Sequence, residues 1–283
     1  MHVYRRLKVT VYVLLSFWVG YEAANNDVFP IGQFVDRNFV SEDKSLTSLQ
    51  KKLDLFSDTD KKNEVKCPDV NDAYVIIGFG QSNSANHGGH RFVATKKKIY
   101  NFFNGRCYVA SDPLLGATGR GGSVWIPLAE QLPSNRIVYA TFGVGGTKLS
   151  QWLSDDSFIA LFRQNVLELK KFYPDPDLAI WIQGESDKDT PKAVYEDLLR
   201  NWIGELRKEL PTTRIAISGT SYCNGSGNKE ITGVQEKLSD ELGLTYLGAT
   251  DRLTESSHRY DDCHFSERGL MALSHLLAKG LMR

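Results

Sequence analysis

Short apolar runs alternate with longer helical segments from residue 74 onward, and this alternation is what most constrains the fold. Five runs are rich in aliphatic and β-branched residues and short enough to be buried strands. They are Tyr74–Ile77, Arg136–Phe142, Leu178–Ile182, Arg214–Ser218 and Leu244–Leu247. Strands that alternate with helices form a parallel sheet covered on both faces. The sequence therefore predicts an α/β fold, a three-layer α/β/α sandwich around a five-stranded parallel sheet.

Helices are expected between these strands. They are Val124–Leu132, Phe158–Phe172, Gly233–Leu242 and Ser266–Met282, and a longer one that starts at Pro191 with Thr190 as its N-cap. In the longer helix, apolar residues recur every four positions and predict one buried stripe. The stripe consists of Val194, Leu198, Trp202, Leu206 and Leu210. Residues Gly88–Gly122, between the first two strands, are expected to be an irregular insertion near the functional site.

The N-terminal quarter has a different composition. Arg5, Arg6 and Lys8 precede an apolar run from Val9 to Gly20, which is typical of a secretory signal peptide. The run is shorter than the roughly 20 apolar residues of a membrane span. We therefore predict a signal peptide over residues 1–24, with an uncleaved type II membrane anchor as the alternative. Residues 25–66 are polar, and we predict that they form a stem or poorly ordered extension. We predict that residues 67–283 form the folded domain.

The cysteine count agrees with the secretory route. The four cysteines predict disulfides, and they lack the short paired spacings of zinc sites. Because Cys263 adjoins His264, a nucleophilic thiol is the alternative, but we favour a disulfide between Cys223 and Cys263. Asn224 begins the sequon Asn224-Gly225-Ser226, which predicts glycosylation on a surface loop.

The charge balance argues against two classes of partner. Lys+Arg and Asp+Glu both number 34, so there is no net field to attract nucleic acid or an anionic membrane. We expect no nucleic-acid partner, and membrane association only if the N-terminal segment is an uncleaved anchor.

Polar residues gather where the predicted strands end, at the edge where parallel α/β sheets bind ligands. Ser82 follows a Gly-Phe-Gly turn after the first strand. Serine hydrolysis also needs an imidazole base, a carboxylate that orients it and donors for the oxyanion. His264 supplies the base, and Asp261 lies three residues before it; we favour Asp261 over its neighbour Asp262 as the orienting acid.

Three groups are candidates for the oxyanion hole. They are the Ser82 N–H, an N–H of the Gly145-Gly146 turn and the side-chain amide of Gln183. Glu185 and Asp187 could instead form a glycosidase-like carboxylate pair, but we interpret them as loop-fixing or capping groups. His87 and His90 suggest a metal pair; since no nearby carboxylate completes it, we predict rim residues and no metal.

Four sequence blocks together carry a resemblance to a known family. They are Gly80-Gln81-Ser82-Asn83, Gly145-Gly146-Thr147 with Trp152, Trp181-x-Gln183-Gly184-Glu185-Ser186-Asp187, and Asp261-x-x-His264-Phe265-Ser266. In this order they resemble the SGNH hydrolase superfamily, and within it the sialate O-acetylesterase and acetylxylan esterase group of carbohydrate esterases. The resemblance covers residue 72 to the C-terminus and implies a flavodoxin-like domain.

The resemblance also implies roles. It implies that Ser82 is the nucleophile and that Asp261 and His264 are the acid–base pair. It also implies that Gly146 and Gln183 donate to the oxyanion, with Gly145 as the alternative to Gly146. The implied activity is that of a secreted serine esterase without a cofactor. It removes O-acetyl groups from an acetylated polysaccharide or sialic acid through an acetyl-enzyme. The alternatives are an SGNH esterase of lipid or aryl esters, and a catalytically idle glycan-binding surface protein.

Overall fold

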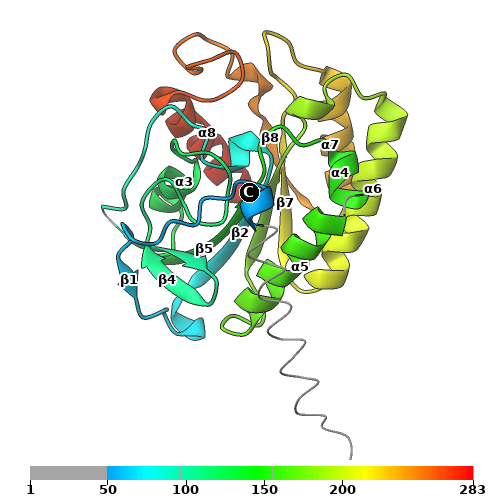
Figure 1. Ribbon diagram of the computed structural model, residues 1–283. Coiled ribbons are helices and arrows are strands. Elements are labelled where there is room, and N and C mark those ends of the chain that lie inside the picture. The colour runs from blue at the N-terminus through cyan, green and yellow to red at the C-terminus, as the bar shows by residue number, and fades with distance from the viewer. Residues whose placement is uncertain (1–49, 96, 155, 283) are drawn as a thin grey trace, which may run out of the picture. The chain divides into compact units, whose positions relative to one another are not determined.

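An eight-stranded sheet with helices on both faces forms the part of the chain that the computed structural model describes (Figure 1). This part comprises residues 50–95, 97–154 and 156–282. The strand order is β1-β4-β3-β5-β2-β6-β7-β8. The five predicted strands are all present and parallel. They are β2 (Tyr74–Gly80), β5 (Arg136–Gly143), β6 (Leu178–Ile182), β7 (Arg214–Gly219) and β8 (Thr245–Ala249).

The prediction of a five-stranded, wholly parallel sheet is wrong, because the sheet is larger and mixed. The predicted irregular insertion contains β3 (Lys98–Phe103) and β4 (Arg106–Val109). Strand β3 pairs parallel with β5, whereas β4 runs antiparallel to β3 and pairs antiparallel with β1 (Glu64–Val65). Asn104 and Gly105, both with positive φ, connect β3 to β4. An Asn-Gly pair in a two-residue hairpin turn is a recognised strand signal that the sequence interpretation passed over.

The helices divide between the two faces of the sheet (Figure 1). Helices α3 (Trp125–Gln131) and α8 (Glu267–Leu281) cover one face. The other face carries α4 (Leu149–Ser154), α5 (Asp156–Lys170), α6 (Lys192–Glu209) and α7 (Lys229–Glu241). Single 3-10 turns follow several strands, at η2 (Ser82–Ser84), η3 (Glu185–Asp187) and η4 (Thr250–Arg252); η1 (Val70–Asp72) precedes β2. The fold thus has the three predicted layers.

Strand β2 lies at the centre of the core and is buried on both faces. Gly78 brings it close to α3, since a Cβ at this position would lie 2.5 Å from the Trp125 ring. On the opposite face, Phe79 packs against Phe162 and Trp181, with ring centroids 5.3 and 5.2 Å away. Large aromatic side chains on both faces therefore fix the strand that carries Ser82 at its end.

Helix α6 buries the predicted stripe only in part: Trp202, Leu206 and Leu210 are buried, and Leu198 is half-buried. Its buried residues are Tyr195, Leu199, Trp202, Ile203 and Leu206, while Val194 is exposed. A strict four-residue spacing drifts around a helix of 3.6 residues per turn, and here its N-terminal end leaves the buried face. The helix begins after Pro191, which occupies the N-cap position. Thr190, the predicted cap, donates its hydroxyl to Asp187 Oδ1 instead.

Residues 50–66 pack on the domain, whereas the sequence predicted a stem or poorly ordered extension there. Leu55 is 4% exposed and forms a β-bridge with Thr118. Lys62 Nζ donates to the carbonyls of Ser111 and Pro113 at 2.6 and 2.7 Å. The folded unit therefore begins well before the predicted boundary at residue 67. The predicted signal peptide or anchor and the rest of the predicted stem, residues 25–49, lie outside the described residues.

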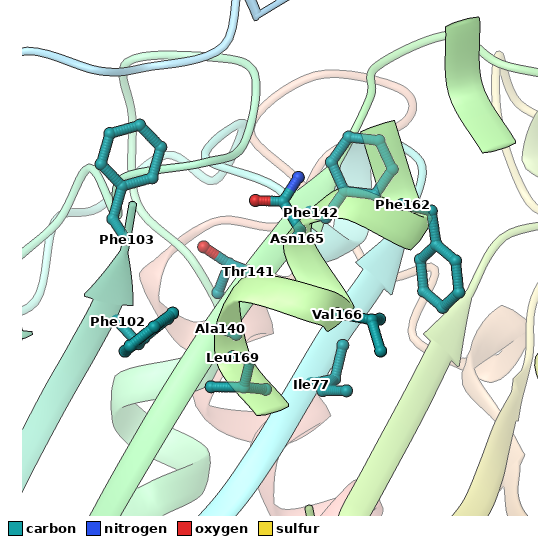
Figure 2. A pocket seen from close by; sticks show the side chains of 10 residues that line it. All are labelled: Ile77, Phe102, Phe103, Ala140, Thr141, Phe142, Phe162, Asn165, Val166 and Leu169. Atoms are coloured by element: carbon teal, nitrogen blue, oxygen red, sulfur yellow. The ribbon is translucent and has the colours of Figure 1, made fainter. Parts of the chain in front are cut away.

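A gap of about 20 Å³ lies between the sheet and α5 (Figure 2). Its lining is apolar except for Thr141 and Asn165, and both are bonded. Thr141 Oγ1 donates to the Leu115 carbonyl and Asn165 Nδ2 to the Leu161 carbonyl, each at 2.8 Å. Because the gap is small and both polar side chains of its lining donate to backbone carbonyls, we interpret it as a packing defect. No helix in the described ranges is both long and apolar enough to cross a membrane.

Candidate active site

A cavity of about 740 Å³ opens beyond the carboxyl ends of β2 and β5, the edge predicted from the sequence. Segments far apart in the chain line it. Its described lining consists of Leu53, Asp54, Gln81, Ser82, His87, Thr118, Gly119, Val144, Gly145, Gly146, Ser186, Cys223, Asn224, Asp261, Asp262, Cys263 and His264. The fold therefore brings Ser82, Asp261, His264 and Gly146 to one cavity.

The turn between β2 and η2 holds Ser82. Gly80 adopts a φ of 134°, and a Cβ there would lie 2.0 Å from the Ile182 carbonyl oxygen, so only glycine fits. Ser82 is 5% exposed, and its hydroxyl has no hydrogen-bond partner within the described ranges. Ser84, two residues on, donates its hydroxyl to the Gln81 carbonyl. The Ser82 hydroxyl is thus available at the cavity, whereas the Ser84 hydroxyl is hydrogen-bonded within the turn.

Asp261 and His264 form a hydrogen-bonded pair. His264 Nδ1 lies 2.8 Å from Asp261 Oδ2, which leaves Nε2 for a proton from a nucleophile. Asp261 Oδ1 accepts the backbone N–H groups of Cys263 and His264. Burial opposes ionisation of this carboxyl, but these hydrogen bonds outweigh it and hold the pKa of Asp261 below its usual value. Asp262 lines the cavity without contacting the imidazole.

His264 also stacks on neighbouring rings. Its centroid lies 5.3 Å from that of His87 and 6.1 Å from that of Tyr260, with nearly parallel planes. Tyr260 donates its hydroxyl to the His87 carbonyl. No direct hydrogen bond joins His264 to Ser82, although both line the cavity. Catalytic hydrogen bonds of serine hydrolases are often long before substrate binds, so the arrangement is compatible with proton transfer.

Two backbone N–H groups remain free beside Ser82. Neither the Ser82 N–H nor the Gly146 N–H has a partner in the described part of the chain. The Gly145 N–H, in contrast, donates to Thr118 Oγ1 at 2.8 Å. Gly146 adopts a φ of 73°, which favours glycine. Of the two glycines that the sequence left open, Gly146 therefore has the geometry of an oxyanion donor.

Gln183 does not have that geometry. Its side chain is fully buried and lies outside the cavity lining. Its amide nitrogen donates to the Thr147 carbonyl at 3.1 Å and to Asp187 Oδ2 at 2.6 Å. Both amide protons are thus used to hold the loop that follows Gly146, so the predicted oxyanion role does not fit the structure. The sequence could place Gln183 at a strand end but could not give its rotamer.

Gln81 is the glutamine that lines the cavity, and the sequence interpretation gave it no role. Its Oε1 accepts the backbone N–H groups of Ser186 and Gly184 at 3.1 and 3.4 Å. These bonds identify the other amide atom as Nε2, which has no partner among the described residues. The position of Gln81 directly before Ser82 was the sequence feature that could have identified it as a site residue. An amide donor fixed in this way can bind a developing negative charge.

Buried carboxylates position the loops around the cavity. Asp187 Oδ2 accepts the Leu149 N–H at 2.7 Å and so caps α4, directly after the Gly146 loop. Glu185 Oε1 accepts from the Asn83 amide and from Thr220 Oγ1, and its burial raises its pKa. Because both side chains are buried away from the cavity lining, they act as loop supports, as the sequence suggested, and not as a glycosidase pair.

His87 is part of the cavity wall, and His90 is not. His87 Nε2 lies 3.0 Å from Thr118 Oγ1, the oxygen that accepts the Gly145 N–H. Burial, with the neighbouring His264, lowers the pKa of His87 to about 4. The ring is therefore neutral at neutral pH, and its Nε2 can accept a hydrogen bond from the Thr118 hydroxyl. His90 instead approaches Glu267 at 3.5 Å, and within the described ranges no three potential metal ligands cluster.

Two disulfides are formed, Cys223–Cys263 and Cys67–Cys107. The first is the predicted pair, and it ties the residue before His264 to a hairpin turn at Asn224 and Gly225. Asn224, the predicted glycosylation site, has a φ of 53° in this turn and lines the cavity. The second disulfide joins the segment before β2 to strand β4 and was not foreseen as a pair.

A family model matches residues 71–283, three quarters of the chain. Its description is carbohydrate esterase, sialic acid-specific acetylesterase. No curated protein sequence is significantly similar to the chain.

Solved structures resemble the chain at low sequence identity. A protein from Arabidopsis thaliana has a TM-score of 0.58 at 19% identity, over 75% of this chain and 98% of its own. NanS has a TM-score of 0.51 at 11% identity, over 76% of this chain and 98% of its own. Est24, a carbohydrate acetylesterase from Sinorhizobium meliloti, has a TM-score of 0.49 at 14% identity, over 74% and 98%.

Proposed function

The chain belongs to the sialic acid-specific acetylesterase family of carbohydrate esterases, and from this premise we propose that it removes O-acetyl groups from carbohydrates with Ser82 as nucleophile. The family makes it a carboxylic ester hydrolase. The observation that carries the rest is the cavity in which Ser82, the Asp261–His264 pair and the free Gly146 N–H lie together.

The proposed reaction has two steps. Ser82 Oγ attacks the acetyl carbonyl while His264 Nε2 takes its proton, and the imidazolium then protonates the departing sugar oxygen. Water, deprotonated by the same imidazole, attacks the acetyl-enzyme, and the imidazolium returns the proton to Ser82 Oγ as acetate leaves. Asp261 holds His264 in the required tautomer through the bond to Nδ1. These steps use only side chains of this cavity.

The anionic intermediates need donors, and three groups can supply them. Ser82 and Gly146 contribute backbone N–H groups, and the Gln81 amide takes the place that the sequence assigned to Gln183. All three residues line the cavity, and their donor atoms have no partner among the residues described. Loss of one such donor typically lowers turnover by roughly 10²–10³.

A small acyl group fits the cavity better than a long one. Among its described lining residues only Leu53 and Val144 have aliphatic side chains, with the Cys223–Cys263 disulfide beside them. Lipid esterases bury an acyl chain at about 0.8 kcal/mol per methylene, which needs a continuous apolar wall. We therefore place an acetyl ester ahead of the lipid and aryl ester alternative. Turnover should fall along an acetyl, butyryl and octanoyl series; a rise with chain length would favour the alternative.

The proposed location is the secretory route. Two disulfides support it, because such bonds persist in oxidising compartments. Glycosylation at Asn224 and cleavage after residue 24 remain predictions. Intact mass and N-terminal sequencing of the protein recovered from a eukaryotic culture medium would test both.

The experiment that tests the proposed function is acetate release from a panel of acetylated glycans, with Ser82→Ala as control. We expect release from at least one glycan by the unmodified chain and none above background by the variant. Equal release by both would refute the mechanism. Absence of release from every glycan would instead favour an idle glycan-binding protein.

A further inference from the structure

The charged side chains that line the cavity are nearly all carboxylates. Asp54 comes from the segment before β1, and Asp261 and Asp262 from the loop before α8. The described lining contains neither lysine nor arginine. His87 adds no positive charge at neutral pH, since its pKa is about 4.

Two of the three carboxylates are compensated. Asp261 is bound to His264. Asp54 Oδ1 lies 2.9 Å from the Arg120 guanidinium, which also donates to the Gly119 carbonyl and stacks on the Phe56 ring. Arg120 is thus paired with Asp54 and is not part of the described lining. Asp262 has no side-chain partner among the described residues and is exposed, so its charge acts on whatever enters.

Two further cations near this edge, Arg259 and Lys188, are bound to other groups. Arg259 is buried behind the Asp261–His264 loop, where it donates to the carbonyls of Leu253 and Cys263 and lies near Glu185 and Asp251. Lys188 donates to Ser226 Oγ at 2.8 Å and is not part of the lining. Lys148, which follows the Gly146 loop, is exposed and has no side-chain partner among the described residues, but it is not part of the lining. The described lining therefore holds no lysine or arginine to receive a sugar carboxylate, which is usually bound by a bidentate arginine or several N–H groups.

We propose that this esterase selects uncharged acetylated sugars and disfavours anionic ones, such as sialic and uronic acids, and that Asp262 is the main determinant. The inference rests on the proposed function and narrows its substrate class. It departs from the sialic acid specificity in the family's description. Two like charges a few ångströms apart at a solvated cavity lower the affinity roughly tenfold, and salt weakens the effect.

A matched pair of substrates isolates the charge. O-acetylated sialic acid and its methyl ester carry the same acetyl group and differ by one negative charge. We expect kcat/KM for acetate release at low ionic strength to be roughly tenfold higher for the methyl ester. The ratio should shrink in about 0.5 M salt, because the Debye length is then only a few ångströms.

Variants then assign the effect to one residue. Asp262→Asn should bring the ratio close to one, and Asp262→Lys should reverse it. Asp189→Asn, which removes an exposed acid outside the lining, should leave the ratio unchanged. Equal kcat/KM for acid and ester in the unmodified chain, or a ratio that Asp262→Lys does not move, would overturn the inference.

A binding measurement separates this inference from the proposed function. The Ser82→Ala chain should bind the methyl ester more tightly than the free acid at low salt, whether or not the unmodified chain releases acetate. If acetate is released from neither compound but binding has this order, the proposed catalysis fails and the charge selection stands. If the free acid binds as tightly as the ester, the charge selection fails whatever the activity.

Discussion

Gly146 illustrates how one backbone conformation can free an N–H group for the oxyanion role proposed for it. Its φ of 73° turns the N–H away from the chain's own acceptors, and nothing lies within 4 Å of the position of a Cβ. Gly146→Ala therefore meets no steric clash but disfavours this conformation by roughly 1–2 kcal/mol. We expect kcat to fall by roughly 10²–10³ as the donor moves, with the fold retained.

A matched glycine controls for this backbone strain. Gly243, after α7, also has a positive φ (62°) and open space at its Cβ position, and it is not part of the cavity lining. Gly243→Ala should lower the melting temperature about as much as Gly146→Ala while leaving kcat unchanged. If both variants keep full activity, Gly146 is not an oxyanion donor.

We predict opposite effects for substitutions at the two glutamines, Gln81 and Gln183. Gln81→Glu keeps an oxygen for the Ser186 N–H but loses the amide donor beside Ser82, so kcat should fall at least about a hundredfold with little change in melting temperature. Gln183→Ala removes buried bonds to Thr147 and Asp187 and should mainly destabilise the protein, by roughly 1–3 kcal/mol. Thermal unfolding and steady-state kinetics on the same samples check both. A selective kcat loss in Gln183→Ala with none in Gln81→Glu would restore the assignment made from the sequence.

His87 predicts a pH dependence of stability. Its pKa falls from about 6.5 in the unfolded chain to about 4 in the folded one, chiefly through burial. Between these values the unfolded chain binds the extra proton, so stability must decrease as pH falls from 6.5 to 4. His87→Gln, whose amide oxygen can also accept the Thr118 hydroxyl, should flatten this part of the curve of melting temperature against pH.

His275→Gln, on the exposed side of α8, controls for the loss of a histidine elsewhere. An unchanged pH curve in His87→Gln would contradict the neutral ring inferred at the cavity wall. The sequence could name His87 only as a rim residue, because its neutral state depends on burial that no local pattern records.

At the scale of elements, the two disulfides are a natural pair for comparison. Each closes a sequence separation of 40 residues, so chain entropy assigns both about 4 kcal/mol of stabilisation. Only the Cys223–Cys263 bridge adjoins His264, the proposed base. Two double variants each remove one bridge: Cys67→Ser with Cys107→Ser, and Cys223→Ser with Cys263→Ser. We expect both to lower the melting temperature by a similar amount.

Activity should separate the two double variants. Without the Cys223–Cys263 bridge, the loop that carries Asp261 and His264 loses its tie to the Asn224 hairpin, and kcat should fall at least tenfold. The other double variant should keep its kcat at temperatures where it is folded. Equal kcat values in both would show that the bridge stabilises the fold without positioning His264.

Elements were predictable where one local rule governed them. Ser266 caps α8 by accepting the Gly269 N–H, and that helix begins where the sequence placed it. The α6 stripe was correct for Trp202, Leu206 and Leu210 but wrong at Val194, because a spacing of four approximates 3.6 only over two turns. The β3–β4 hairpin was missed although Asn104-Gly105 signalled it, because a long aromatic and glycine-rich segment was interpreted as irregular.

At the scale of the whole molecule, the sequence motifs predicted which residues meet but not what surrounds them. Ser82, Asp261 and His264 come together because parallel strands end at one edge of the sheet, a consequence of topology. The wall formed by Leu53 and Asp54 depends on a polar segment whose packing rests on long-range contacts, such as the bridge between Leu55 and Thr118. Such contacts have no local signature, so the domain boundary was placed too late.

The central claim, that Ser82 is the nucleophile of this esterase, is tested most directly by covalent labelling. After reaction with a fluorophosphonate, peptide mass spectrometry should find the label on Ser82, and Ser82→Ala should remain unlabelled. Ser84→Ala, which removes the bound serine of the same turn, should still be labelled at Ser82. A label on any other serine, or acetate release by a chain that carries no label, would contradict the account.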